Sequence, residues 1–134
     1  MTLVVDASAA TALCLAEDGF DLVEGALLAP ILLRSEALAA LQGMHWRQEI
    51  SGELAERAVE RLLAAPIRLV RRTEMYREAR RVASGLGWAK TYDAEYLALA
   101  LIHGAPLLTL DSRLARRAQD LVEVHLPESL RAAG

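Results

Sequence analysis

The sequence predicts an α/β fold, a three-layer α/β/α sandwich whose mostly parallel sheet has about five strands. Three observations support this prediction. Short apolar runs alternate with longer segments of helical periodicity along the 134 residues. The chain shows no linker, repeat or low-complexity segment, so we expect one domain over residues 1–134. Two apolar runs end in an aspartate, at the edge of a parallel sheet where ligands bind.

The first elements alternate strand and helix. The run LVV at 3–5 predicts a buried strand, and residues 8–16 place small apolar side chains on one helical face. A short helix is expected after Asp18. ALLA at 26–29 predicts a second strand, which we expect Pro30 to stop.

Two helices and a strand are expected next. Apolar residues keep helical spacing from Ile31 to about Gln48. Ser51 is a candidate N-cap for a helix that ends before Pro66. IRLV at 67–70 then predicts a strand.

The last third repeats the alternation. A helical face from Met75 to Leu86 is expected to close at Gly85 and Gly87. Thr91 opens another helix, which is apolar all round over 96–102 and must therefore be covered on most sides. PLLTL at 106–110 predicts a strand that ends at Asp111, an arginine-rich helix follows, and VEV at 122–124 is the candidate last strand.

The composition is that of a globular protein. Hydrophobic residues make up 54% of the chain and charged residues 25%, which excludes a disordered chain. A single cysteine, Cys14, excludes a disulfide framework and suits a reducing compartment. No apolar run reaches the roughly 18 residues of a membrane span. The start, MTLVVDASAA, lacks the basic segment of a signal peptide. We therefore expect a cytoplasmic protein with no membrane contact.

The net charge of −3 does not decide whether the protein binds nucleic acid. Arginines gather in two places. One group lies over 68–81, where Glu74 and Glu78 are candidate partners on a solvated face. The other lies on the predicted helix after Asp111 and consists of Arg113, Arg116 and Arg117.

Two acids follow predicted strands. Asp6 ends the first strand and Asp111 ends the strand at 106–110, so both can project into the crevice beyond the strand ends. The alternative is structural, because aspartate is also a preferred N-cap for the helix that follows.

Two further acids lie on predicted helices. Glu36 has Ala40 and Gly43 on the same helical face, a stripe of small residues that lets another backbone approach closely; the alternative is a surface glutamate. Asp93 lies in the first turn of its helix, where the helix dipole alone would favour an anion.

These four acids would repel one another if the fold brought them together without a cation. His45, His103 and His125 are scattered, so the available ligands are oxygens. Oxygen ligands favour Mg²⁺ or Mn²⁺ over zinc. Such an ion can stabilise charge on a phosphoryl oxygen.

Four segments occur in an order that resembles the PIN-domain family, and the length resembles its small VapC-like toxin branch. They are VVDASA, LLRSEALAAL, TYDAEYLALA and PLLTLDSRLARRA, and the resemblance spans residues 3 to 126. It implies a metal-dependent ribonuclease with a parallel sheet between helices. It also implies RNA as the substrate, a VapB-type antitoxin as partner, and a homodimer.

The resemblance assigns roles to residues. The acidic quartet would be Asp6, Glu36, Asp93 and Asp111, with Ser8 and Thr109 as supporting hydroxyls. Asp6, Asp93 and Asp111 would hold one or two Mg²⁺ ions. Glu36 would complete the shell or orient the attacking water. Glu95 is an additional acid without an assigned role.

Several residues near these motifs are candidates for RNA contacts. Trp88 and Tyr92 could stack on a base, although core packing accounts equally well for Trp88. The candidates for phosphate contacts, whose alternative is a solvated helix face, are Lys90, Arg113, Arg116 and Arg117.

Three other functions are weighed against a nuclease. An aspartyl-phosphate phosphatase needs an acid two residues after the first aspartate, where this chain has Ser8. A phospho-accepting receiver domain, like that phosphatase, needs a lysine late in the chain, and the only lysine, Lys90, precedes a helix. A catalytically inactive PIN-like binding protein is disfavoured because all four acids are present.

Overall fold

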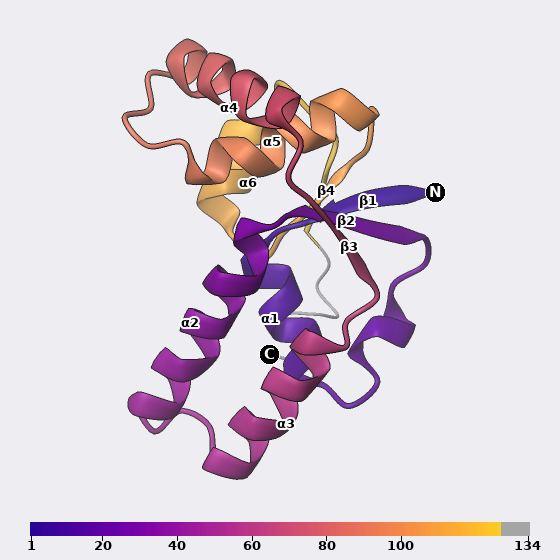
Figure 1. Ribbon diagram of the computed structural model, residues 1–134, viewed down its shortest axis with the longest axis vertical. Coiled ribbons are helices and arrows are strands. Elements are labelled where there is room, and N and C mark those ends of the chain that lie inside the picture. The colour runs from indigo at the N-terminus through magenta and orange to yellow at the C-terminus, as the bar shows by residue number, and fades with distance from the viewer. Residues whose placement is uncertain (127–134) are drawn as a thin grey trace.

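A five-stranded parallel sheet forms the centre of the computed structural model, which describes residues 1–126 (Figure 1). The last eight residues of the expected domain 1–134 lie outside the described residues. The strands are, in spatial order, β3 (Ile67–Val70), β2 (Ala26–Pro30), β1 (Thr2–Val5), β4 (Leu107–Leu108) and β5 (Val124–His125). Every pair of neighbouring strands among them is parallel. The predicted α/β class is therefore confirmed, and the described sheet is parallel throughout.

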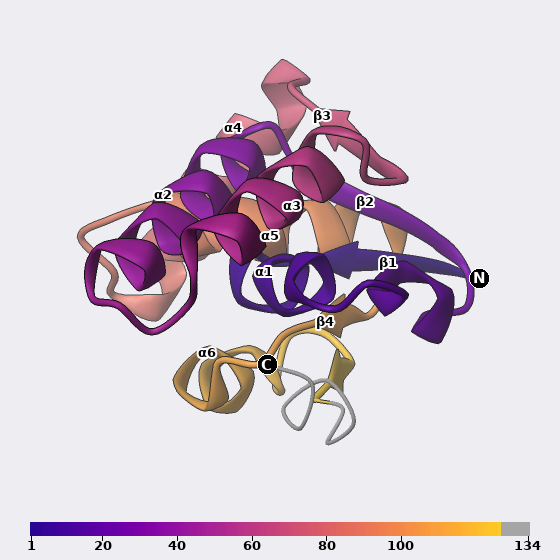
Figure 2. The same ribbon diagram turned by 90° about the horizontal axis from the view of Figure 1, so that it is seen from below.

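Helices cover both faces of this sheet (Figures 1 and 2). One face carries α1 (Ala7–Leu15), α2 (Leu32–Trp46) and α3 (Gly52–Leu63), and the other carries α4 (Thr73–Leu86), α5 (Tyr92–His103) and α6 (Ser112–Ala118). A short 3₁₀ helix, η1 (Gly19–Leu22), joins α1 to β2. Right-handed crossovers account for this division. The chain runs from β1 to β3 in one direction along the sheet, and it then runs back from β3 to β4 and on to β5 in the opposite direction, which places α4, α5 and α6 on the other face.

Helix α5 is the central element of its layer. It packs against α4 on one side and against β1 and β2 on the other. Its residues from Ala94 to Ala100 are all buried. The burial expected over 96–102 is confirmed only as far as Ala100, because Leu101 and Ile102 are 37% and 40% exposed. Each fully buried leucine, such as Leu97, contributes about 1.5–3 kcal/mol of hydrophobic stabilisation. None of the helices in residues 1–126 combines the length and hydrophobicity needed to cross a membrane.

The strand predicted over 106–110 is shorter in the structure. Strand β4 pairs only over Leu107–Leu108, because polar side chains take up the backbone amides that follow. The Leu110 amide donates to Ser8 Oγ at 2.9 Å, and the Asp111 amide donates to Thr109 Oγ1 at 3.0 Å.

Two other predicted boundaries were wrong, and a third was correct in part. The last strand is Val124–His125 rather than 122–124, because the Val122 amide still bonds to the Ala118 carbonyl in a helical turn. Pro30 pairs with Val70 as the last residue of β2. Helix α4 continues through Gly85 and ends at Gly87, whose left-handed backbone (φ 71°) suits glycine.

The neighbouring strands β1 and β4 form the switch point of the sheet. The chain leaves β1 toward α1 on one face and leaves β4 toward α6 on the other. A crevice opens at such a point beyond the carboxyl ends of the strands. Asp6 and Asp111 are the residues that immediately precede α1 and α6, so the fold places both at this crevice.

Candidate active site

Asp6 is the most deeply buried acid at this edge of the sheet, with 4% of its surface exposed. Its carboxylate accepts hydrogen bonds from the Ala9 amide (3.0 Å), the Ser8 hydroxyl (2.7 Å) and the Thr109 hydroxyl (2.5 Å). Burial raises the pKa of Asp6; these three bonds act in the opposite direction, and the nearby Asp111 carboxylate raises the pKa further. Asp6 is thus both the N-cap of α1 and a fixed, buried oxygen donor.

The hydroxyls of Ser8 and Thr109 connect β1 to β4 around Asp6. Their oxygens lie 3.3 Å apart. Each hydroxyl donates to one oxygen of Asp6 and accepts a backbone amide from the segment after β4. The two predicted supporting hydroxyls therefore lie in direct contact with the first acid.

Glu36 reaches the same edge from α2. It is half-buried, and its Oε1 accepts a hydrogen bond of 2.5 Å from the Tyr96 hydroxyl. Burial is the main cause that raises the pKa of Glu36, the bond from Tyr96 lowers it, and the carboxylates of Asp93 and Asp6 raise it. Glu36 is therefore not the solvated surface glutamate of the alternative interpretation.

Tyr96 is a site residue that the sequence interpretation did not identify. Its side chain is 1% exposed, and burial together with the Glu36 carboxylate raises its pKa far above the ordinary value. A signal for it exists in the sequence, because a tyrosine in an otherwise apolar buried helix needs a partner for its hydroxyl.

Asp93 and Asp111 form the solvent-exposed rim of the site. Partial burial and the Asp111 carboxylate raise the pKa of Asp93, whereas Arg117 lowers it. Asp111 Oδ1 accepts the amides of Arg113 (2.9 Å) and Leu114 (3.1 Å) and so caps α6. A hollow of about 170 Å³ lies between the two acids and is lined by Asp93, Asp111, Arg113, Leu114 and Arg117.

The structure brings all four predicted acids to one edge of the sheet. Neighbouring carboxylates raise the pKa of three of them: Asp111 acts on Asp6 and on Asp93, and Asp93 and Asp6 act on Glu36. Four elements that are far apart in the sequence supply these side chains. Asp6 directly follows β1, Asp111 is the N-cap of α6, and the helices α2 and α5 supply Glu36 and Asp93.

The chemistry of this cluster fits a hard divalent cation. All four donors are carboxylates, and a bound cation would relieve their repulsion. Within residues 1–126 no three His, Cys, Asp or Glu side chains already stand close enough together to hold an ion. Mg²⁺ is commonly held by one or two carboxylates together with water ligands, and carboxylates are the donors that this cluster offers.

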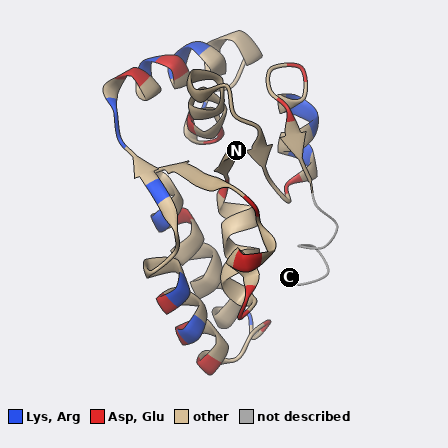
Figure 3. Ribbon diagram, turned by 90° about the vertical axis from the view of Figure 1, so that its right-hand side faces the viewer, with Lys and Arg blue, Asp and Glu red and all other residues tan. Residues whose placement is uncertain are grey.

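Three of the four residues predicted to contact phosphate line a hollow near the acids, and the fourth does not. Arg113 and Arg117 line the hollow beside Asp111, and Lys90 lines a neighbouring hollow. Arg116 is exposed and lines neither of them. Figure 3 shows the basic residues of α6 close to acidic ones at this side of the molecule.

The arginine group over 68–81 contains the predicted surface ion pairs, which join Arg72 to Glu74 (3.2 Å) and Arg81 to Glu78 (2.7 Å).

Glu95 is buried on α5 next to this site, with 8% of its surface exposed. Its Oε1 has no hydrogen-bond partner within the described part of the chain. Burial and the nearby Glu36 carboxylate raise its pKa. A buried carboxylate without a partner destabilises the fold unless it is protonated.

Comparison with known proteins gives one family and two similar structures. Residues 3–120 match the family described as PIN domain. The structure of PAE2754 from Pyrobaculum aerophilum is similar to this chain, with a TM-score of 0.73 and 24% identity over 99% of this chain and 95% of that one. The structure of VapBC-1 from nontypeable Haemophilus influenzae is also similar, with a TM-score of 0.59 and 18% identity over 93% and 97% of the two chains. Among curated proteins no match was found.

Proposed function

The chain belongs to the PIN-domain family, whose members are typically nucleases, and on this premise we propose that it is a Mg²⁺-dependent endoribonuclease of the VapC toxin type. One observation carries the proposal: Asp6, Glu36, Asp93 and Asp111 come from distant parts of the chain and lie near enough at one edge of the sheet for their charges to act on one another. The substrate would be RNA, hydrolysed at a phosphodiester bond. The distant likeness to a VapBC structure supports the toxin assignment.

We assign the metal-binding role to the acidic quartet, with Mg²⁺ as the ion and Mn²⁺ as the other candidate. Asp6 is the fixed donor, because three hydrogen bonds hold its carboxylate before any ligand arrives. Asp93 and Asp111 lie at the exposed rim and would complete the binding from the solvent side. A divalent cation at this cluster supplies stabilisation of negative charge on the phosphoryl oxygens and acidifies water.

Glu36 is the candidate general base. Burial raises its pKa, so its carboxylate is a stronger base than that of an exposed glutamate. The Tyr96 hydroxyl occupies Oε1 and orients the group, which leaves Oε2 to accept a proton from the attacking water. Tyr96 is a positioning residue in this assignment.

Cleavage of RNA by the purified chain tests the function. Single-stranded or loop RNA should be cut with Mg²⁺ or Mn²⁺, and EDTA should stop the reaction. Asp6→Asn should abolish cleavage while the circular dichroism spectrum stays that of the parent. Asp21→Asn is the matched control, because Asp21 is an exposed aspartate on η1, outside the quartet. Cleavage by Asp6→Asn at the parental rate would show that the metal-site assignment is wrong.

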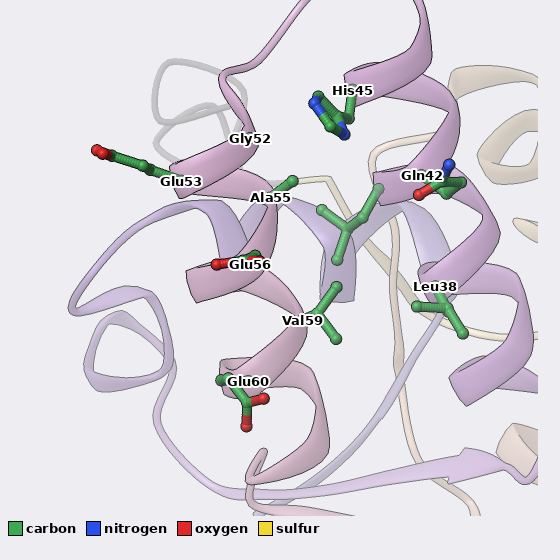
Figure 4. Close-up of a pocket in the computed structure, with 10 residues that line it drawn as sticks. Leu38, Gln42, His45, Gly52, Glu53, Ala55, Glu56, Val59 and Glu60 are labelled. Atoms are coloured by element: carbon green, nitrogen blue, oxygen red, sulfur yellow. The ribbon is translucent and has the colours of Figure 1, made fainter.

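A partner proposal follows from a groove of about 780 Å³ between α2 and α3 (Figure 4). Its apolar lining comes from Leu38, Leu41, Ala55 and Val59, and three acids on α3 line it as well. These acids are spaced for one helical face and are Glu53, Glu56 and Glu60. We assign this groove to a VapB-type antitoxin, through an amphipathic helix with basic residues beside its apolar face.

The antitoxin assignment is tested with the protein encoded beside this chain's gene. Co-expression should yield a complex, and replacing the three groove glutamates with lysine should weaken it strongly at low salt. The same number of exposed glutamates replaced elsewhere, such as Glu17, Glu24 and Glu74, should leave it intact. Equal loss in both variants would show that the groove is not the docking site. The expected homodimer belongs to the same proposal and is measured by sedimentation.

The alternative function is a catalytically inactive PIN-like binding protein. It predicts an antitoxin-type complex without RNA cleavage under any metal. A receiver-like module predicts a labile phosphoryl group after incubation with acetyl phosphate, which the nuclease should not acquire.

A further inference from the structure

A second hollow, of about 510 Å³, lies beside the carboxylate cluster. Its volume falls within the roughly 300–1,000 Å³ of small-molecule sites. Half of its lining comes from residues 87–90 in the connection between α4 and α5, and the other half consists of Glu36, Tyr92, Asp93 and Arg117. Asp93 and Arg117 also line the smaller hollow at Asp111, so the two hollows adjoin. A chain that enters one can continue into the other.

The two aromatic residues of this hollow differ in availability. Trp88 is half-buried and packs on the hydrophobic core, and the Arg117 guanidinium lies 5.4 Å from the centroid of its ring. Trp88 therefore supports Arg117 by a cation–π contact. Tyr92, the first residue of α5, is 55% exposed and directly precedes Asp93. Tyr92 is thus the ring that a ligand can reach.

The charges of the hollow complete the description. Lys90 is exposed, and Arg117 lies where its charge lowers the pKa of Asp93. An accessible aromatic ring next to two cations matches a ligand with a flat π-surface and a negative charge. A nucleotide has both, and its base must be unpaired to stack on a side chain.

We propose that this hollow binds one unpaired nucleotide of an RNA strand, next to the phosphodiester at the carboxylate cluster. The base stacks on Tyr92, and the phosphate contacts Lys90 and Arg117. This inference rests on the proposed function for the identity of the strand as RNA. It adds a requirement for single-stranded substrate at the nucleotide beside the cleaved bond.

The test measures binding, independently of cleavage, by fluorescence anisotropy of a labelled eight-nucleotide oligouridylate. All variants are made in the Asp6→Asn background and compared in the same Mg²⁺ buffer. Tyr92→Ala should weaken binding by roughly 5- to 150-fold, the range of one base–aromatic stack. Tyr92→Phe should bind as the parent does, because the ring remains. Tyr76→Ala is the matched control, since Tyr76 is 43% exposed near the opposite end of α4.

A second probe separates stacking from charge attraction. An abasic octamer of the same length keeps the phosphates and loses the bases. It should bind the parent about as weakly as the intact octamer binds Tyr92→Ala, and Tyr92→Ala should not weaken it further. Equal affinity of Tyr92→Ala and parent for the intact octamer, or no binding by the parent, would overturn the subsite. If base-dependent binding is present but the parent with native Asp6 cuts no RNA, the subsite stands and the proposed nuclease function fails.

Discussion

The Tyr96 hydroxyl donates a hydrogen bond of 2.5 Å to Glu36 Oε1. The two residues belong to α5 and α2, which lie on opposite faces of the sheet. Their contact closes the two helical layers over the carboxyl ends of the strands. This hydrogen bond therefore both joins the two helical layers and orients the carboxylate of Glu36, the candidate base.

Removal of this bond should be measurable without any substrate. Tyr96→Phe keeps the ring and leaves Glu36 without its hydrogen-bond donor. The free energy of unfolding should therefore fall by about 1–2 kcal/mol, near the lower end of the range for hydrogen bonds to charged groups. Urea denaturation at pH 7 measures the loss. Tyr76→Phe, at an exposed position on α4, should leave the midpoint unchanged. An unchanged midpoint in Tyr96→Phe would contradict a contribution of the bond to stability.

Two buried threonines offer a matched comparison. Thr109 donates to the buried carboxylate of Asp6, whereas Thr11 Oγ1 has no hydrogen-bond partner within residues 1–126. Thr109→Val should cost about 1.5–3 kcal/mol of unfolding free energy, because it removes a bond to a charged group. Thr11→Val should be neutral or stabilising, because it removes an unpaired buried hydroxyl. Equal destabilisation by both substitutions would refute the assignment of the Thr109 bond.

The buried acids predict that the metal-free protein loses stability as the pH rises. The pKa values of Asp6, Glu36, Asp93 and Glu95 are raised above the ordinary 3.8 for aspartate and 4.5 for glutamate. These carboxyls bind more protons in the folded chain than in the unfolded chain. Their contribution to the free energy of unfolding therefore falls as the pH rises through the ordinary value to the raised one.

Glu95 allows that pH dependence to be assigned to a residue. Glu95→Gln removes the charge and keeps the size, so the decline of the melting temperature from about pH 4 upward should become shallower in EDTA. Glu53→Gln, an exposed glutamate on α3, is the control and should leave the slope as it is. Parallel curves for parent and Glu95→Gln would mean that Glu95 does not contribute to the effect.

Mg²⁺ should stabilise the folded protein through preferential binding. A concentration one hundred times the dissociation constant adds about 2.7 kcal/mol. Asp93→Asn should raise the melting temperature in EDTA, because it relieves repulsion with Asp111, and it should reduce the increase that Mg²⁺ causes. Thermal denaturation with millimolar MgCl₂, against NaCl of equal ionic strength, measures both. The metal site would be in doubt if Mg²⁺ and NaCl acted alike on the parent.

The arginines of α6 should divide by position. Arg113 and Arg117 line the hollow at Asp111, and Arg116 does not. In the Asp6→Asn background, Arg113→Ala and Arg117→Ala should each lower RNA affinity and flatten the log–log salt slope by roughly 0.7. Arg116→Ala should change neither quantity. If all three substitutions have equal effects, α6 attracts RNA only through its overall charge.

The sequence was sufficient to predict the alternation of strands and helices and the acid that directly follows β1. Asp111 was expected at the end of a strand, and it lies beyond β4 as the N-cap of α6. These features depend on local periodicity and on the rule that ligands meet the carboxyl ends of parallel strands. The resemblance to a known family added the convergence of Glu36 and Asp93 with Asp6 and Asp111, which spacing along one chain could not supply.

The features that were missed depend on contacts between distant residues. Strand β4 is short because hydroxyls from Ser8 and Thr109 take its next amides, and strand propensity carries no information about such competition. The burial of Glu95 and the Tyr96–Glu36 bond arise from the packing of α5 between α4 and the sheet. Periodicity identified that helix as buried without indicating which polar group met which partner.

The hydroxyl bridge around Asp6 has a consequence for the protein during its synthesis. Thr109 follows Asp6 by 103 residues in the chain, so the ribosome makes Asp6 long before the residue that fixes it. Until the segment after β4 has left the ribosomal tunnel, neither the Thr109 hydroxyl nor the Asp111 carboxylate can reach Asp6. An unfinished chain therefore has no assembled acidic centre. The edge of the sheet that carries the four acids is therefore assembled only after most of the chain has been made.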